Sequence, residues 1–378
     1  MKKHITGKKT RALSGGPQQQ PWMGVAQKVT VGIDLGDRES HYCMLSEEGQ
    51  VVSRGRVATT KSGLREVFEK MPASRIALEV GTHSPWVSRE LAAMGHQVIV
   101  ANPHKVKLIT QSTQKNDPID AEKLARLARV DPQLLSPVQH RGAQAQADLA
   151  VIRARAELVK VRSQLIVTAR GLTKSQGERL KPCDGDQVKV ALAAELGAEL
   201  RNMLEPLLRS VETISEEIAN YDRQLEELQK RYPEVELLTQ VYGVGLLIGL
   251  TYMLTVDDPE RFAHSRDAGA FVGLKPKQRE SGDQQPQLGI SKGGDRLLRS
   301  YLVQAAHCIL RQGAPPCDLQ EWGRAHMQSG GKRGKKRAVV AVARKLAVLL
   351  HRLWVSGEVY DPRYNQKAKA QGAKAKAA

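Results

Sequence analysis

The first third of the chain alternates short apolar runs with segments of helical spacing. Apolar runs bounded by turn residues predict strands, and apolar residues recurring every three or four positions predict helices. Strands are expected at residues 29–35, 41–46, 50–57, 75–80 and 97–101, and helices at residues 61–71, 85–94 and 118–130. Three hairpin strands followed by alternating helices and strands predict an α/β domain with a mixed sheet covered by helices, in the element order of an RNase H-like fold.

From about residue 143 the pattern becomes almost entirely helical. One long helix is expected at residues 143–175, and a later helix carries an apolar seam with alternating spacings of four and three. The seam consists of Leu207, Val211, Ile214, Ile218, Tyr221, Leu225 and Leu228, and Tyr232-Pro233 ends it. This pattern is typical of a coiled-coil hairpin or a dimerising arm, although an ordinary helix packing within its own domain has it too.

Changes in composition and in predicted secondary structure divide the chain into five parts. They are a disordered basic arm (1–27), an RNase H-like catalytic domain (28–140), a helical coiled-coil region (141–235), a mainly α domain (236–355) and a flexible basic tail (356–378). The apolar window at 241–256 is short and rich in glycine, so it predicts a buried helix pair and no membrane span.

Charge narrows the class of partner. The 378 residues carry a formal net charge of +18, which favours a polyanion, and nucleic acid is the commonest one. An anionic membrane surface would require a long basic amphipathic helix, which the sequence does not suggest. Aromatic residues make up only 4% of the chain, so contacts to phosphates should dominate and binding should weaken steeply with salt. The N-terminus lacks the apolar run of a secretory signal, and a cytoplasmic, nucleoid-associated protein is expected.

Four acidic residues are the main candidates for chemistry. Asp34 and Glu79 end apolar runs, and Asp117 and Asp120 open a helix in the sequence N-D-P-I-D. Each has a structural explanation as a turn former or a helix cap, although a carboxylate within a buried run is costly unless it is paired. Carboxylates that converge from strands and a helix repel one another and need cations between them. Hard oxygen ligands predict Mg²⁺ or Mn²⁺ acting on a phosphate backbone.

A second group of candidates lies in the C-terminal third. Ser281 stands among Lys275, Lys277 and Arg279, which could hold a phosphate next to a serine nucleophile, although a Ser-Gly turn in a loop is the commoner meaning. Lys292, Arg296 and Arg299 are spaced to share one face near the start of a helix, where they would bind phosphates unless they form a solvated surface. Two divalent ions held by the acids could activate either water or a serine hydroxyl for phosphodiester cleavage.

Taken together, these residues resemble the IS-one-ten (IS110) family of insertion-sequence transposases, the DEDD transposases or bridge-RNA-guided recombinases. The resemblance covers roughly residues 28–355. It is carried by the segments V-G-I-D-L-G, L-E-V-G-T and K-N-D-P-I-D-A, and then by V-Y-G-V-G, G-L-K-P, S-G and I-S-K-G-G-D-R-L-L-R. Each segment alone is a weak signal, whereas the acid motif and the glycine-serine series in combination are fairly specific.

The resemblance implies a Holliday-resolvase-like domain joined by a coiled coil to a separate transposase domain. It implies that the four acids bind Mg²⁺ and that Ser281 attacks the DNA and holds it covalently, with Ser265, Ser291 and Ser300 as alternatives. It further implies a guide RNA from the element itself, and a homo-oligomer, a dimer or tetramer, in which the serine of one subunit meets the acids of another.

The hypothesis from sequence is therefore a site-specific DNA recombinase that mobilises an insertion sequence through a phosphoserine intermediate. A serine ester conserves the phosphodiester energy, in agreement with the lack of a nucleotide-binding motif. The basic segment 330–337 is expected to be a loop, and its G-K-R-G-K at 331–335 does not match the P-loop pattern. Two alternatives stay open. One is a metal-dependent junction endonuclease that uses activated water, and the other is a nucleic-acid-binding protein without catalytic activity.

Overall fold

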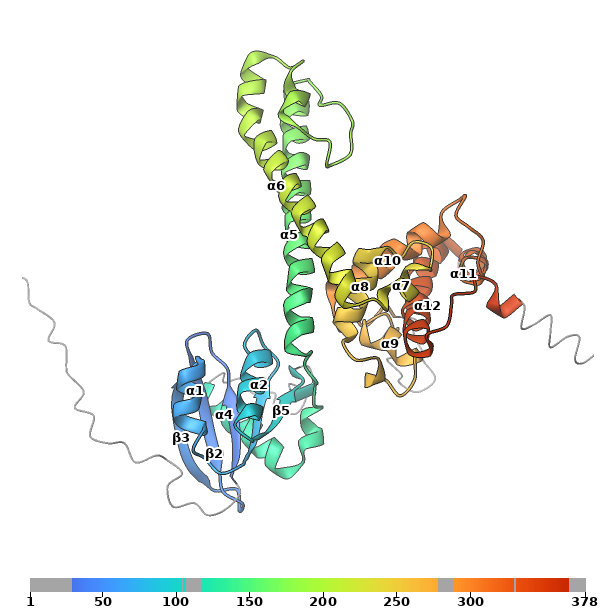
Figure 1. The fold of residues 1–378 in the computed structure, drawn as a ribbon. Helices are drawn as coiled ribbons and strands as arrows, with labels where there is room; N and C mark the ends of the chain where they lie inside the picture. The colour runs from blue at the N-terminus through green and yellow to red at the C-terminus, as the bar shows by residue number, and fades with distance from the viewer. Residues whose placement is uncertain (1–28, 104, 107–116, 278–287, 330, 367–378) are drawn as a thin grey trace, which may run out of the picture. The chain divides into compact units, whose positions relative to one another are not determined.

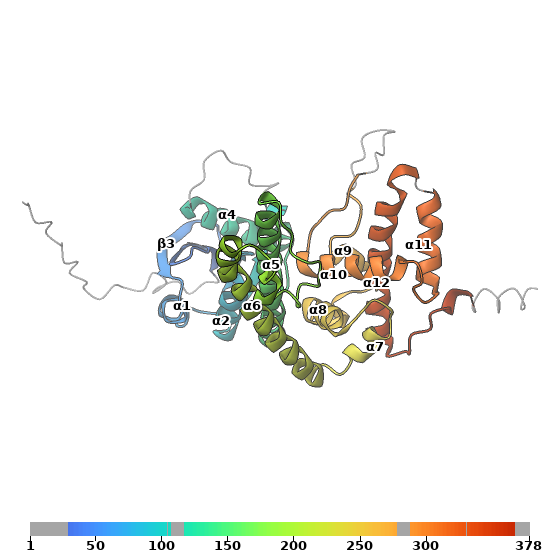
Figure 2. The same ribbon diagram turned by 90° about the horizontal axis from the view of Figure 1, so that it is seen from above.

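The computed structural model describes residues 29–103, 105–106, 117–277, 288–329 and 331–366. The chain separates into two compact units, Met1–His140 and Arg141–Ala378 (Figures 1 and 2). The expected N-terminal arm and the end of the basic tail lie outside the described residues.

The first unit contains a five-stranded mixed sheet in the order β3-β2-β1-β4-β5. The strands are β1 (Thr30–Asp34), β2 (Glu39–Leu45), β3 (Val51–Ala58), β4 (Arg75–Glu79) and β5 (Gln97–Ala101). The first three strands pair antiparallel, and β1–β4 and β4–β5 pair parallel. All five predicted strands are confirmed. The antiparallel strands are joined by tight turns, and the parallel strands are joined by helical crossovers.

Helices cover both faces of this sheet. They are α1 (Lys61–Phe68), α2 (Ser84–Ala93) and α4 (Asp117–Val130), with a short 3₁₀ turn, η1 (Pro132–Leu135), after α4. Val31 and Ile33 point toward the core shared with α1 and α2. Residues of opposite parity, such as Cys43 and Leu45, pack against Ala121 and Ala125 of α4. Gly32 and Asp34 therefore lie on the α4 face, because successive side chains of a strand alternate between faces.

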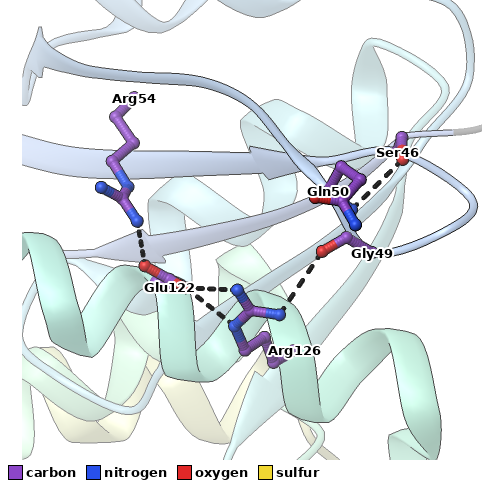
Figure 3. A network of polar contacts seen from close by, with 6 residues as sticks. All are labelled: Ser46, Gly49, Gln50, Arg54, Glu122 and Arg126. Atoms are coloured by element: carbon purple, nitrogen blue, oxygen red, sulfur yellow. Dashed lines mark hydrogen bonds and ion pairs between the residues drawn. The ribbon is translucent and has the colours of Figure 1, made fainter.

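Polar contacts fasten α4 to the turn between β2 and β3 (Figure 3). Glu122 of α4 forms an ion pair with Arg54 of β3. It forms a second ion pair, at 2.6 Å, with Arg126 one turn further along α4. Arg126 also donates to the Gly49 carbonyl at 3.4 Å. Burial alone would raise the pKa of Glu122, but the hydrogen bond from Arg126 and the nearby charge of Arg54 hold it below its usual value. The network fixes the helix against the hairpin.

The second unit begins with two long helices, α5 (Ala143–Ser175) and α6 (Ala198–Arg231), which form a helical hairpin; the short turn η2 (Val190–Ala193) lies between them (Figure 1). At one end of the hairpin Ile166 of α5 packs with Leu204 of α6, and at the other Leu149 packs near Leu225. The predicted seam is buried at Val211, Ile218, Leu225 and Leu228 and half-buried at its other positions. The seam thus packs within the chain, and pairing between chains stays a prediction.

Shorter helices form the rest of this unit. They are α7 (Val235–Thr239), α8 (Leu246–Val256), α9 (Arg266–Phe271), α10 (Arg296–Leu310), α11 (Asp318–Ser329) and α12 (Gly334–Ser356), with 3₁₀ turns η3 (Pro259–Arg261) and η4 (Gly331–Arg333). Their core includes Tyr252, whose buried hydroxyl donates to the Ala347 carbonyl at 2.7 Å. The prediction of a buried helix pair at 241–256 was wrong: this window holds a turn at 241–245 and one helix, α8, because α7 already ends at Thr239.

A second expectation about the C-terminal region was wrong. The basic segment 330–337 was expected to be a loop, but its second half is the first turn of α12. Gly334 and the small residue Ala338 are buried while Lys335, Lys336 and Arg337 face solvent, so the segment is an amphipathic helix start. Among the helices that the structure describes, none has the length and apolar character needed to cross a membrane.

Candidate functional site: an acid quartet and a serine-flanking clamp

Two of the predicted acids lie side by side at the ends of parallel strands. β1 and β4 pair with Ile33 opposite Leu78, so the next residues, Asp34 and Glu79, end neighbouring strands at the same end of the sheet. The two acids have the same parity and therefore face the same side, the side covered by α4. Both are half-buried, as expected for polar groups at the margin of a sheet.

The other two acids reach this place because α4 packs unusually close to β1. A side-chain carbon added at Gly32 would stand 2.0 Å from the Ala121 carbonyl oxygen and 2.5 Å from the Ala125 nitrogen. Only glycine permits such an approach of helix backbone to strand backbone. Ala121 and Leu124 are buried against the sheet. Asp117 and Asp120 precede them by four residues each, so both acids extend the sheet-facing side of the helix.

Electrostatics links all four carboxylates. The pKa of Asp34 is raised from 3.8 to about 6, first by burial and then by the negative charges of Asp117, Asp120 and Glu79. Burial is the largest cause, and the three other acids add to it through space. We call these four residues the acid quartet. The four residues thus lie near one another at one end of the sheet.

Two basic side chains border the quartet, and the sequence analysis did not single them out. His41 stands opposite Asp34 in the β1–β2 register, and its Nδ1 lies 3.9 Å from an Asp117 carboxylate oxygen. Lys123 Nζ lies 2.9 Å from Asp120 Oδ1. The signals were present in the sequence: a short β1–β2 turn places residues 34 and 41 across from each other, and a spacing of three places Lys123 beside Asp120 on the helix.

The donor set fits a hard divalent cation, but the side chains are not arranged around a common point. Carboxylate oxygens are the ligands that Mg²⁺ and Mn²⁺ prefer. Within the part of the chain that the structure describes, no three His, Cys, Asp or Glu side chains form a group that could hold a metal ion. The Asp117 side chain is 64% exposed and Asp120 is engaged by Lys123. Binding of a metal would therefore require these side chains to turn toward Asp34 and Glu79.

The predicted serine site is only partly covered. Ser281 and Arg279 lie outside the described residues, but the chain on both sides of 278–287 is described. An antiparallel bridge joins Pro276 to Ile290, and the amide of Lys277 donates to the Gly289 carbonyl at 2.9 Å. We call the residues 272–277 and 289–295, together with Arg299, the serine-flanking clamp.

The predicted phosphate-binding residues differ in their surroundings. Lys275, Lys277, Lys292 and Arg296 are exposed. Lys292 has a φ of 58°, a left-handed conformation that is uncommon for a lysine. Arg299 is half-buried, and its Nη1 donates to the carbonyls of Val272 at 3.1 Å and Gly293 at 3.0 Å. The three exposed lysines and Arg296 are available to phosphates, whereas the guanidinium of Arg299 is largely engaged with backbone carbonyls.

The three alternative serines also differ in their surroundings. Ser265 lies 3.0 Å from Nδ1 of buried His351, whose Nε2 is 2.8 Å from the Pro259 carbonyl. A carbonyl accepts only, so Nε2 carries the proton and the Ser265 hydroxyl donates to Nδ1. Ser291 belongs to the clamp, where its amide donates to the Lys275 carbonyl at 2.9 Å. Ser300 is an exposed residue of α10.

Comparisons with known proteins agree with this division of the chain. A family model of DEDD transposases matches residues 31–175, the segment that holds the acid quartet. A second model, described as transposase of the IS116/IS110/IS902 family, matches residues 235–318, which include the clamp. The chain is thus a transposase, a DNA-processing enzyme of insertion sequences. More narrowly, it belongs to the IS110 family of insertion-sequence transposases.

Individual relatives match nearly the whole chain. The chain is 29% identical to the transposase for insertion sequence element IS1111A of Coxiella burnetii, over 87% of this chain and 90% of that protein. It is 27% identical to a probable family 20 transposase of Pseudomonas aeruginosa, over 88% of this chain and 98% of the relative. The transposase for element IS1328 of Yersinia enterocolitica is also 27% identical, with the same coverage of both chains.

Proposed function

We propose that the protein is a site-specific DNA recombinase that excises and inserts its own element, with the acid quartet binding Mg²⁺ and Ser281 acting as the nucleophile. The observation that carries the proposal is the placement of Asp34 and Glu79 at the ends of paired strands, beside the start of the helix that bears Asp117 and Asp120; the pKa of Asp34, raised to about 6 by burial and by the three other acids, agrees with it. A half-buried carboxylate beside three other acids is held there at a cost, and a divalent cation would remove that cost.

The acids would act by holding the metal against the DNA. Bound Mg²⁺ supplies charge that stabilises the attacking and leaving oxygens of a phosphodiester displacement. Asp34 and Glu79 come from the rigid sheet, and Asp117 and Asp120 come from a helix locked to it through Gly32. The Lys123 ammonium would leave Asp120 when the metal binds, because both compete for the same oxygen.

The serine step conserves the energy of the DNA backbone. The Ser281 oxygen bonds to phosphorus, and the bond from phosphorus to one deoxyribose oxygen breaks. In net terms the proton that the serine hydroxyl loses is taken up by this leaving oxygen, which becomes a free hydroxyl on that strand. Attack by a deoxyribose hydroxyl reverses the step and rejoins DNA. Lys275 and Lys277, both exposed beside this segment, would neutralise the phosphate during the displacement.

The remaining parts of the proposal rest on the family and on the fold. Two antiparallel pairs followed by two parallel pairs, in the order β3-β2-β1-β4-β5, support an RNase H-like first domain. The proposal also includes guidance by an RNA from the element and assembly as a dimer or tetramer, both of which are implied only by the resemblance of the sequence motifs to the family. The long α5–α6 hairpin with its half-buried seam residues supports a coiled-coil contact in that assembly.

The test uses a plasmid that carries the DNA flanking the coding sequence, RNA transcribed from that DNA, and Mg²⁺. Wild-type protein should form a protein–DNA adduct that survives denaturant, and both Ser281→Ala and Asp34→Asn should abolish it. Persistence of the adduct in Ser281→Ala, with its loss in Ser265→Ala, would move the nucleophile to the serine that is bonded to His351.

The junction endonuclease remains the second candidate because the quartet alone would suffice for it. In that case Asp34→Asn abolishes cleavage, Ser281→Ala does not, and the cleaved product carries no protein. A protein without catalytic activity predicts no cleavage by the wild type at any Mg²⁺ concentration.

A further inference from the structure

Helix α12 presents only positive charge to solvent. From Gly334 to Ser356 it contains no Asp or Glu, and its buried side is mostly apolar. Its exposed basic residues are Lys335, Lys336, Arg337, Arg344, Lys345 and Arg352. Arg352 pairs with Glu358 at 3.5 Å, but within the part of the chain that the structure describes no carboxylate pairs with the other five. A solvated helix face usually mixes both signs, so this face is suited to a polyanion.

Helix α11 packs closely beside α12 (Figure 2). A side-chain carbon added at Gly334 would stand 2.3 Å from the Met327 carbonyl oxygen, and one added at Gly323 would stand 2.6 Å from a Val342 methyl carbon. Because the earlier residue of α11 meets the later residue of α12, the two helices run antiparallel. Glycine at both points lets them approach, so the side chains that flank the contact have fixed positions.

Three side chains form an ordered row across this helix pair. The Lys345 ammonium of α12 lies 4.3 Å from the ring centroid of Trp322 of α11. The His326 ring, one turn further along α11, is parallel to the indole within 8°, and the two centroids are 5.2 Å apart. Trp322 is 36% exposed, and His326 and Lys345 are exposed as well. The row therefore offers solvent both a stacking surface and positive charge.

Two further basic residues lie on the same side of α12 as this row. Arg337 precedes Arg344 by seven residues and Lys345 by eight, and both spacings are about two helical turns. The three side chains therefore project along one stripe of the helix. We call Trp322, His326, Arg337, Arg344 and Lys345 the basic aromatic face.

We propose that the basic aromatic face binds single-stranded nucleic acid: a base joins the stack of Trp322 and His326, and the three basic residues meet the neighbouring phosphates. A duplex hides the faces of its bases, whereas every unpaired base has a ring face open to stacking. This inference rests on the proposed function, in which strand exchange and an RNA guide both involve unpaired strands. It adds base stacking to the phosphate contacts expected from the low aromatic content.

A membrane surface fits the same charges less well. Basic helices that lie on membranes carry a broad apolar face beside their charges. Between its basic residues, the stripe on α12 carries only the small Ala341 and the half-buried Val348. Val355, the large apolar residue of this helix with an exposed side chain, lies beyond them near the end of the helix. The face therefore favours nucleic acid over lipid.

The experiment measures dissociation constants of the protein by fluorescence anisotropy in EDTA, so that a metal at the acid quartet plays no part. The labelled probes are an oligothymidylate and an oligouridylate of about 20 nucleotides and a DNA duplex of about 20 base pairs. Trp322→Leu keeps an apolar side chain without a ring, and we expect it to bind the single strands about 5- to 100-fold more weakly. Its affinity for the duplex should change by less than about twofold, since no base face is open there.

Three further variants separate stacking from charge and from folding. Trp322→Phe keeps a ring and should retain most of the affinity for single strands. Arg337→Ala should lower the magnitude of the salt slope for a single strand by about 0.7, the loss of one phosphate contact. Tyr242→Leu is the matched control: Tyr242 is 39% exposed but lies in the turn before α8, outside the face, so no affinity should change. If Trp322→Leu does not fold, His326→Ala takes its place, with an expected loss of about 5-fold.

The three probes also identify the strand. A loss with both oligonucleotides assigns the face to unpaired strands in general, a loss with oligouridylate alone assigns it to RNA, and a loss with oligothymidylate alone assigns it to opened DNA; each supports the proposal. Unchanged affinity for both oligonucleotides, or equal losses for single strands and duplex, would overturn it. Unchanged affinity together with lost binding to phosphatidylserine vesicles would overturn it in favour of a membrane. An adduct that persists in Ser281→Ala refutes the proposed function and leaves this binding comparison intact.

Discussion

The acid quartet and the serine-flanking clamp are built in opposite ways. In the quartet, charges from two strands and a helix repel one another, and burial together with this repulsion raises the pKa of Asp34. In the clamp, the charge of Arg299 is engaged by carbonyls of its own unit, and the nearby charge of Asp295 by Arg153. Both places depend on a close backbone approach that only glycine allows, Gly32 in one and Gly273 in the other.

This difference separates groups that need a ligand from groups that hold the scaffold. Repulsion within the quartet is a cost to the folded protein that a bound cation would relieve. In the clamp, Arg299 and Asp295 have no such cost, because their charges are engaged within the chain, whereas the exposed lysines of the clamp are free to meet phosphates. Changes at the quartet should therefore respond to pH and to divalent ions, whereas changes at the clamp should respond to neither.

The largest expected effect comes from filling the space at Gly32. Gly32→Ala would place a carbon 2.0 Å from the Ala121 carbonyl, so α4 must move away from β1. We expect a loss of about 2–3 kcal/mol in the free energy of unfolding by urea, with loss of DNA cleavage. Gly171→Ala in α5 is the control: that site is open, and alanine should stabilise the helix by about 0.5–1 kcal/mol. A neutral Gly32→Ala would contradict the account of α4 packing.

The second effect is the pH dependence of Asp34. Because its pKa rises from 3.8 to about 6 on folding, the folded state binds more protons between these values, and stability falls as pH rises through this window. Above about pH 6, the free energy of unfolding of Asp34→Asn should exceed that of wild type by about 1–2 kcal/mol. This value is discounted for solvent screening because the side chain is half-exposed. Below pH 4 the two should agree in urea unfolding. An equal difference at all pH values would remove Asp34 from a repulsive cluster.

A third effect is stabilisation by the metal. At Mg²⁺ ten times above its dissociation constant, wild type should gain about 1.4 kcal/mol of stability, measured as a higher thermal midpoint at pH 7.5 without nucleic acid. Asp34→Asn should lose this gain, and Arg299→Ala should keep it because the clamp takes no part in metal binding. A gain of the same size in Asp34→Asn would place the metal elsewhere.

The smallest effect concerns Lys292, which has a left-handed backbone. Glycine adopts this conformation without strain, so Lys292→Gly should fold as well as wild type or up to about 1 kcal/mol better, and Lys292→Ala should not gain. Both variants should lower the magnitude of the salt slope for DNA binding by about 0.9. An unchanged slope would mean that the lysine is retained for a reason other than phosphate contact.

Much of the first domain could be predicted from sequence because its signals are local. Apolar runs and helical spacing located the strands and helices to within a few residues, and α5 was predicted with its observed bounds. The start of α12 was missed because a run of lysines and glycines has the composition of a loop. Only tertiary packing of Gly334 and Ala338 shows it to be helical.

The candidate site was less predictable because its geometry depends on contacts between distant residues. Acid types and their order were visible, but the close approach at Gly32, which brings α4 to β1, depends on residues about ninety positions apart. Arg299 shows the opposite limit. Its spacing from Lys292 and Arg296 suggested a phosphate-binding face, and nothing local indicates that its guanidinium folds back onto carbonyls of residues 272 and 293.

The contact at Gly32 has a mechanical consequence for the quartet. With strand and helix backbones in direct touch, and with Glu122 tying the same helix to the β2–β3 hairpin, β1 and α4 behave as one solid body. A divalent cation that draws the four carboxylates together cannot do so by moving β1 and α4 relative to each other. Binding of the cation therefore has to proceed through changes of side-chain rotamer alone, which are fast, small in amplitude and reversible each time the cation binds and leaves.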